Sequence, residues 1–108
     1  MLTSAYSEGI ADARSEDSRY TLEYTPAGLR ELEKLDWSVR RKVFADIEKL
    51  KENPRPHGVE KMEAKEKLYR AAVGPGKSYR AIYQIRDEVL LVLVVKVGDR
   101  KDVYRRVK

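Results

Sequence analysis

KLYRAAVGPGKSYRAIYQIRDEVLLVLVVKVGDR, residues 67–100, has the pattern of consecutive β-strands joined by short reversals. Residues 67–73 and 78–86 each read as a strand, because apolar side chains recur between polar ones. The glycine- and proline-rich sequence GPGK at residues 74–77 separates them and is a strong turn signal. The two segments are therefore expected to pair as an antiparallel hairpin.

A second reversal is expected at residues 86–88, leading into an apolar strand over residues 89–97. Apolar side chains on both faces of this strand predict an interior position in the sheet, with helices covering at least one side. A reversal there would place Arg80 beside residues 95 and 96. The GPGK turn would likewise place Arg70 and Arg80 within about one residue of register on adjacent strands, whose spacing is about 4.8 Å.

The first half of the chain changes from a strand pattern to a helical one. Residues 20–24 alternate apolar and polar side chains, which predicts a strand with one buried face. Thr25 followed by Pro26 is typical of a helix N-cap with proline at the first helical position. The apolar side chains that follow predict a short helix that ends near Leu35.

A second helix is expected to follow, capped by Asp36 or Ser38. Its apolar residues recur at three- and four-residue spacing over residues 39–50, the stripe of a helix with one buried face. The sequence NPRP at residues 53–56 then ends the helix. We expect Trp37 to lie in the core at the junction of the two helices.

These elements predict an α+β fold: an N-terminal strand, a two-helix hairpin, and then a three- to four-stranded antiparallel sheet. Residues 102–107 are expected to form a short final strand or tail. Residues 1–18 are rich in serine, alanine and acids without a sustained period, so they are interpreted as a flexible N-terminal extension. Residues 19–108 are then one domain, which suits a chain of 108 residues that is 42% hydrophobic.

Composition excludes several kinds of chemistry. The chain has no cysteine, which excludes disulfides, thiol nucleophiles and cysteine-ligated metal sites. Its one histidine, His57, lies between proline and glycine and is interpreted as a turn residue. The longest apolar run, residues 89–95, is far shorter than the ~20 residues of a membrane-spanning helix. No secretory signal pattern begins the chain, so a cytoplasmic protein without a membrane partner is expected.

The net charge of +5 is unevenly distributed along the chain. Residues 1–19 carry four acidic and two basic side chains, whereas the last thirteen residues carry six basic and two acidic ones. A polyanionic partner such as a nucleic acid would be attracted to such a cationic segment. The alternative interpretation is an ordinary solvated basic tail.

The predicted sheet gathers basic side chains near one of its ends, where Arg70, Arg80 and Arg100 are followed by Tyr104. Guanidinium groups bind phosphate through two parallel contacts, and a phenol ring can stack on an unpaired base. This set suits RNA, although each residue also has a plain structural interpretation as an exposed or edge side chain. The charged helix faces at residues 30–31 and 40–42 are interpreted as solvated surface.

Several sequence segments resemble the RelE/ParE superfamily of toxins from bacterial type II toxin–antitoxin systems. The resemblance covers about residues 20–107, and its most specific part is SYRAIYQI followed by an apolar strand and VGDR. The other matching segments are YTLEYTPAGLRELEKL, NPRPHGVEKM, LYRAAVG and the closing VY. The resemblance implies a RelE-like microbial RNase fold.

RelE-like toxins are metal-independent endoribonucleases that need no cofactor. They cut mRNA in the ribosomal A site, where the 2′-hydroxyl of the RNA attacks the adjacent phosphate. The resemblance therefore implies that Arg80 holds the scissile phosphate, that Arg100 stabilises the transition state and leaving group, and that Tyr104 stacks on the substrate base. Arg70 corresponds to one of a pair of basic residues, and Ala72 stands at the other position of that pair.

The identity of the general base stays open, because arginine is effectively never deprotonated. Lys77, Lys96 and Lys101 are the lysines that could take that role if their pKa values were lowered. These three lysines, together with Arg105, are also candidate contacts to RNA phosphates.

The resemblance also implies a set of partners. They are a cognate RelB-like antitoxin, the ribosome and its mRNA, and operator DNA only through the antitoxin complex.

Two alternatives to the nuclease function remain. One is a ParE-like protein that shares the fold, lacks nuclease activity and inhibits DNA gyrase. The other is a non-catalytic basic module that binds RNA.

Overall fold

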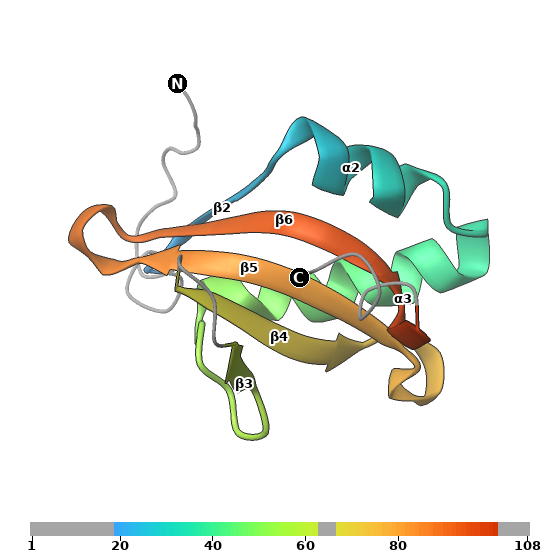
Figure 1. Ribbon diagram of the computed structural model, residues 1–108. Helices are drawn as coiled ribbons and strands as arrows, with labels where there is room; N and C mark the ends of the chain where they lie inside the picture. The colour runs from blue at the N-terminus through green and yellow to red at the C-terminus, as the bar shows by residue number, and fades with distance from the viewer. Residues whose placement is uncertain (1–18, 63–66, 102–108) are drawn as a thin grey trace.

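The computed structural model describes residues 19–62 and 67–101, which form a five-stranded mixed sheet and two α-helices (Figure 1). The predicted α+β class is confirmed. The elements, in chain order, are β2 (Thr21–Tyr24), α2 (Pro26–Glu33), α3 (Trp37–Glu48), η1 (Lys49–Lys51), β3 (Glu60–Met62), β4 (Leu68–Val73), η2 (Pro75–Lys77), β5 (Tyr79–Arg86), η3 (Asp87–Val89) and β6 (Leu91–Asp99). The expected extension over residues 1–18 and the expected final strand over residues 102–107 lie outside the described residues.

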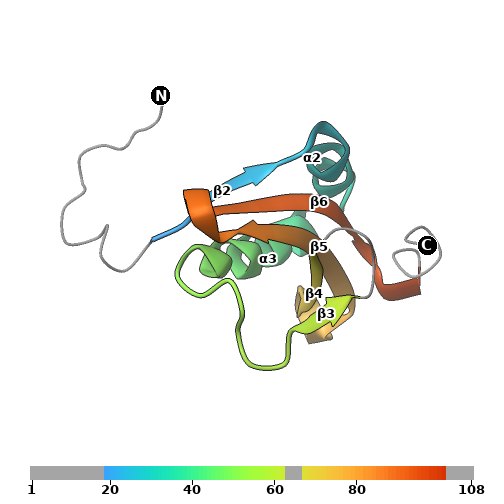
Figure 2. The same cartoon turned by 60° about the vertical axis from the view of Figure 1, so that its left-hand side comes forward.

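The strand order is β2-β6-β5-β4-β3. β2 runs parallel to β6, and the other neighbouring pairs are antiparallel. The sequence pattern predicted an N-terminal strand and a later antiparallel sheet of three or four strands, and it assigned no partner to the first strand. The structure adds the parallel pairing of β2 with β6 and the short strand β3. β3 has three residues, EKM, and is too short for a period to show. In Figure 2, β3 and α2 lie at opposite edges of the sheet.

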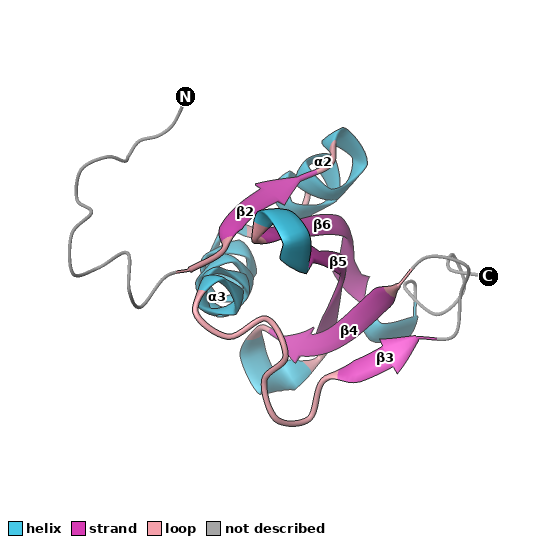
Figure 3. Ribbon diagram, turned by 90° about the vertical axis from the view of Figure 1, so that its left-hand side faces the viewer, coloured by secondary structure: helices cyan, strands magenta, loops and turns pink. Residues whose placement is uncertain are grey.

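The two helices occupy different places on the sheet. α3 packs across one face, and α2 lies beside the part of β6 that β2 does not reach (Figures 1 and 3). The predicted cap of α2 is present, since the Thr25 hydroxyl accepts a hydrogen bond of 3.0 Å from the Gly28 N–H. A Cβ atom on Gly28 would lie 2.7 Å from the Val94 carbonyl oxygen. Glycine at this position therefore allows α2 to approach the backbone of β6 closely.

α3 follows the predicted apolar stripe, but Trp37 does not. Val43 and Ile47 are fully buried, whereas Trp37 is 61% exposed. The expectation that Trp37 lies in the core is wrong, because the first turn of α3 directs this side chain to solvent. The Arg41 guanidinium lies 4.9 Å from the centre of its ring, a cation–π contact on the outer surface of the helix.

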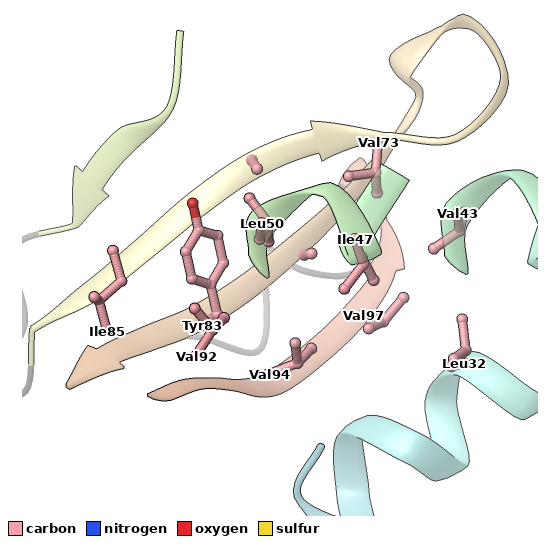
Figure 4. Close-up of a cluster of buried hydrophobic side chains, with 12 residues drawn as sticks. Leu32, Val43, Ile47, Leu50, Val73, Tyr83, Ile85, Val92, Val94 and Val97 are labelled. Atoms are coloured by element: carbon pink, nitrogen blue, oxygen red, sulfur yellow. The ribbon is translucent and has the colours of Figure 1, made fainter. Parts of the chain in front are cut away.

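One hydrophobic core joins the helices to the sheet (Figure 4). Its largest side chain is Tyr83, which is fully buried and satisfies its hydroxyl by donating a 2.7 Å hydrogen bond to the Pro54 carbonyl. The other members come from α2, α3, η1 and three strands: Leu32, Val43, Ile47, Leu50, Ala71, Val73, Ala81, Ile85, Val92, Val94 and Val97.

The β4–β5 hairpin forms at the predicted turn, with Gly74 and Gly76 at φ values of +82° and +62°. Its register differs from the expectation. Arg80 pairs with Ala72, and Arg70 pairs with Ile82. Arg70 and Arg80 are therefore diagonal neighbours on one face of the sheet rather than nearly opposite residues, because the turn also includes Ser78 and the first strand pair is Val73 with Tyr79.

The β5–β6 reversal is longer than expected. It uses a 3₁₀ turn and Leu90 in the left-handed region at φ +51°, so β6 begins at Leu91 rather than at residue 89. A bulge follows, because Ile82 pairs with Lys96 while the adjacent Tyr83 pairs with Val94. As a result Arg80 lies opposite Gly98, and the expected pairing with residues 95 and 96 is wrong.

Candidate functional site

The candidate arginines of β4 and β5 lie on the face of the sheet that points away from the core. Ala71 and Ala81 belong to the core, so the residues before them, Arg70 and Arg80, lie on the opposite face of the sheet. Glu60 joins this face because it pairs directly with Arg70 across β3 and β4. We call the surface formed by Glu60, Arg70 and Arg80 the basic face.

The Arg80 guanidinium folds back over the hairpin turn. Its Nη1 atom donates hydrogen bonds of 2.8 Å to the Lys77 carbonyl and 3.0 Å to the Tyr79 carbonyl. Within residues 19–62 and 67–101, no carboxylate forms an ion pair with Arg80. The backbone thus orients the guanidinium while leaving its charge available to an anion.

Arg70 is held differently, by an ion pair with the Glu60 carboxylate. The hydrogen bond and charge of Arg70 lower the pKa of the Glu60 carboxyl, and the charge of Arg80 lowers it further. Both guanidinium groups therefore act on the same carboxylate. The basic face contains a mixed cluster of two cations and one anion rather than a purely positive patch.

Arg100 reaches the same corner of the sheet through the backbone. Its N–H donates a 3.2 Å hydrogen bond to the carbonyl of Ser78, the residue that precedes β5. The Asp99 carboxylate accepts a 2.9 Å hydrogen bond from the Lys101 N–H, and the backbone is helical at Arg100 and Lys101. The side chains of Arg100 and Lys101 are exposed. Tyr104 and Arg105 lie outside the described residues.

Lys96 is engaged within the protein. Its ammonium lies 2.9 Å from one oxygen of Glu31, and the other oxygen of Glu31 accepts a 2.8 Å hydrogen bond from the Val97 N–H. The Lys96 and Glu31 side chains are 16% and 20% exposed. The interpretation of Glu31 as a solvated charge is therefore wrong. Its carboxylate accepts a hydrogen bond from a backbone N–H of β6 at a position that β2 does not reach.

The remaining candidates lie at the edges of the site. Lys77 is exposed in the GPGK turn and contributes its carbonyl to Arg80. His57 is exposed in the loop before β3, as expected of a turn residue. It borders a hollow of about 810 Å³ between α3, this loop and the edge of β4, which Lys42, Lys49 and Lys77 also line.

A second polar cluster lies at the opposite end of the sheet from Arg80, near the β5–β6 reversal. It was not predicted from the sequence. Asp87 accepts a 2.5 Å hydrogen bond from the Tyr20 hydroxyl and forms an ion pair of 2.8 Å with Arg55. Arg55 also lies 5.4 Å from the ring centre of Tyr69. Tyr20 and Asp87 are 67 positions apart, so no local sequence pattern predicts the contact between them.

The described residues contain neither a candidate metal cluster nor a membrane-spanning helix. No group of three or more histidine, aspartate or glutamate side chains in residues 19–62 and 67–101 is placed to hold a metal ion. No helix in these ranges is long and apolar enough to cross a membrane.

The fold and the matched residues define a class of protein. Residues 22–104 match the family model for the ParE toxin of type II toxin–antitoxin systems. The chain belongs to this family, within the RelE/ParE superfamily of toxins, which confirms the resemblance seen in the sequence.

Individual relatives agree with this assignment. A RelE-like toxin protein of Escherichia coli is 30% identical over 88 residues, which span 80% of this chain and 90% of the relative. The crystal structure of the isolated E. coli RelE toxin superimposes with a TM-score of 0.63 at 29% identity, covering 80% of this chain and 92% of that chain. The toxin in the intact E. coli RelBE toxin–antitoxin complex gives a TM-score of 0.62 at 29% identity, covering 74% and 95%.

Proposed function

We propose that this toxin is a ribosome-dependent endoribonuclease that cuts mRNA in the A site and so inhibits translation. The observation that carries the proposal is Arg80, a guanidinium oriented by two backbone carbonyls and not ion-paired with any carboxylate of the described residues. The similarity to the RelE toxin of E. coli supports the same reading.

The proposed chemistry is attack of an RNA 2′-hydroxyl on the adjacent phosphate. Arg80 binds the scissile phosphate and stabilises the negative charge that develops on it. The backbone N–H of Arg100 is hydrogen-bonded to Ser78, which precedes β5. The Arg100 side chain stabilises the transition state and leaving group. Tyr104 stacks on the substrate base. Positioning and charge stabilisation are the contributions that this set of residues can make without a metal ion.

Lys77, Lys101 and Arg105 are proposed as contacts to flanking phosphates. The exposed side chains of Lys77 and Lys101 suit this role. Lys96 can take part only by exchanging its Glu31 partner for a phosphate.

The proposed protein partner is a RelB-like antitoxin. The E. coli RelE toxin that resembles this chain forms a complex with its antitoxin. By analogy, an antitoxin would neutralise the basic face, and operator DNA would be contacted only by the complex.

The experiment is a reconstituted translation reaction in which mRNA 5′ ends are mapped by primer extension. The purified toxin is added with and without ribosomes. Cleavage confined to ribosome-bound mRNA at A-site codons is the expected result. Cleavage of free mRNA at the same rate would contradict ribosome dependence.

Inhibition of DNA gyrase is the second candidate, because the matching family model is that of the ParE toxin. A supercoiling assay with purified gyrase separates the two functions. A toxin that blocks supercoiling and leaves ribosome-bound mRNA intact would establish the gyrase function in place of the nuclease. A third outcome, RNA binding without cleavage that weakens evenly as basic residues are removed, would indicate a binding module.

A further inference from the structure

The orientation of the Arg80 guanidinium depends on the shape of the GPGK turn at residues 74–77. The Lys77 carbonyl oxygen, at the end of this turn, accepts the 2.8 Å hydrogen bond from Nη1 of Arg80. The Lys77 N–H in turn donates a 3.0 Å hydrogen bond to the Gly74 carbonyl, which closes the turn. A movement of the turn would therefore displace the oxygen that holds Arg80.

The turn contains a residue in an uncommon backbone conformation. Lys77 has a φ of +55°, in the left-handed region that residues other than glycine rarely adopt. A residue in this region persists only where its surroundings hold it. The next residue carries the second arginine, because the Ser78 carbonyl accepts the 3.2 Å hydrogen bond from the Arg100 N–H. The places of both arginines therefore depend on what fixes the turn.

α3 fixes the turn through the carboxylate of Asp46. One oxygen of this carboxylate accepts a 2.9 Å hydrogen bond from the Gly74 N–H. A hydrogen bond from a backbone N–H to a carboxylate is one of the stronger kinds in proteins. The other oxygen of Asp46 lies 3.6 Å from the Lys49 ammonium, and the Asp46 side chain is only 21% exposed. Helix and turn are closely packed here, since a Cβ atom on Gly74 would lie 2.8 Å from Val43.

These contacts connect the two faces of the sheet. α3 packs against the face that carries the core, whereas Arg80 lies on the basic face. Gly74 directly follows β4, and the turn ends at Lys77, two residues before β5 begins. Asp46 is thus linked to Arg80 through the backbone of the turn, from the side of the sheet opposite the proposed RNA site.

We propose that Asp46 is a positioning residue of the RNA site, which holds the GPGK turn in the shape that presents the Lys77 carbonyl to Arg80. The inference rests on the proposed nuclease function. Without the Asp46 carboxylate, the Gly74 N–H loses its acceptor and the turn is free to move. The Arg80 guanidinium then loses its fixed place beside the scissile phosphate. A displacement of ~1 Å at a group of this kind can cost ~10²-fold in rate.

The test measures single-turnover cleavage of A-site mRNA over a range of ribosome concentrations. Asp46→Ala is expected to lower the maximal rate on the order of 10–10²-fold and to leave the half-saturating ribosome concentration unchanged. Asp46→Asn keeps an oxygen that can accept the Gly74 hydrogen bond, so it should recover most of the rate. Lys49→Ala removes the other partner of Asp46 and leaves the bond to Gly74, so it should cleave like the wild type.

A double variant separates positioning of Arg80 from a general loss of stability. If Asp46 acts through Arg80, the variant that carries both Arg80→Ala and Asp46→Ala should cleave as fast as Arg80→Ala alone. Rates are compared per folded molecule, with the folded fraction measured by circular dichroism. If Asp46→Ala does not fold, Asp46→Leu takes its place, because leucine has a similar size, lacks an acceptor and favours helices.

Three results would overturn the proposal while leaving the nuclease function intact. They are a wild-type rate for Asp46→Ala, an Asp46→Asn variant as slow as Asp46→Ala, and losses that multiply in the double variant. Absence of cleavage by the wild type removes the nuclease function itself, and the role of Asp46 with it.

Discussion

Arg80 lies directly opposite Gly98 in the β5–β6 ladder. Gly98 precedes Arg100 by two positions in the sequence. Glycine at this point places no side chain beside the Arg80 guanidinium. β6 ends at Asp99, and the N–H of the next residue, Arg100, donates a hydrogen bond to the carbonyl of Ser78, which precedes β5. A long-range strand pairing thus brings two arginines that are 20 positions apart in sequence to one corner of the sheet.

Removing the Arg80 side chain should strongly slow cleavage without unfolding the protein. Arg80→Ala deletes the oriented guanidinium, and loss of one such donor to transition-state charge typically costs ~10²–10³-fold in rate. Arg80→Lys should give an intermediate rate, because a point charge replaces a two-pronged donor. The measurement is the single-turnover rate on ribosomes.

The matched control for this prediction is Arg86→Ala. Arg86 lies in the same strand, and its guanidinium bonds to Gln84 at the far end of the sheet from Gly98. Near wild-type cleavage by Arg86→Ala is expected. Equal losses in the two variants would mean that overall charge, rather than the position of Arg80, supports the activity.

Glu31→Ala should destabilise the fold measurably. The substitution leaves the Val97 N–H without its acceptor and removes the ion-pair partner of Lys96. Loss of a partner for a largely buried donor costs about 1–3 kcal/mol in the free energy of unfolding. Urea denaturation checks this value, with exposed Glu33→Ala as the control. If the two variants unfold at the same urea concentration, the Glu31 contacts contribute nothing.

Gly28→Ala should also lower stability, although alanine normally favours helices. The added Cβ would meet the Val94 carbonyl oxygen at 2.7 Å, so α2 would have to move away from β6. Overpacking of this kind costs about 1–3 kcal/mol. Thermal unfolding of the variant is the measurement. An unchanged or higher melting temperature would show that α2 does not need this close approach.

Acid should weaken the cluster formed by Tyr20, Arg55 and Asp87. Hydrogen bonds from Arg55 and Tyr20 lower the pKa of the Asp87 carboxyl below its ordinary value. A carboxyl with a lowered folded-state pKa contributes stability above its unfolded pKa of about 4, and this contribution disappears as the pH falls through the lower value. The free energy of unfolding of the wild type should therefore approach that of Asp87→Asn between pH 5 and about pH 2. A constant difference across this range would contradict the assignment.

Much of the fold could be predicted from local patterns. The Thr25-Pro26 helix start, the stripe through Val43 and Ile47, and the GPGK hairpin all depend on residues close together in sequence, and all were confirmed. The parallel pairing of β2 with β6 could not be predicted in this way, because it depends on how the helices return the chain to the sheet.

The site was less predictable than the fold. The sequence pointed to Arg70 and Arg80 as neighbours, but their register depended on the length of the β4–β5 turn. The position of Arg80 opposite Gly98 depended on the Leu90 reversal and on the bulge in the β5–β6 pair. Glu31 and Glu60 were missed as contacts of the basic side chains. Each lies on an element remote from its partner in sequence or too short to show a period, so only the three-dimensional pairing reveals it.

The central claim is that the 2′-hydroxyl of ribosome-bound mRNA attacks the adjacent phosphate at the basic face. The most direct measurement uses two mRNAs that differ only in one 2′-deoxy substitution at the mapped A-site cleavage position. The wild-type toxin should cut the all-ribose mRNA and leave the substituted bond intact on the same ribosomes. Equal cleavage of both mRNAs at that bond would contradict the account.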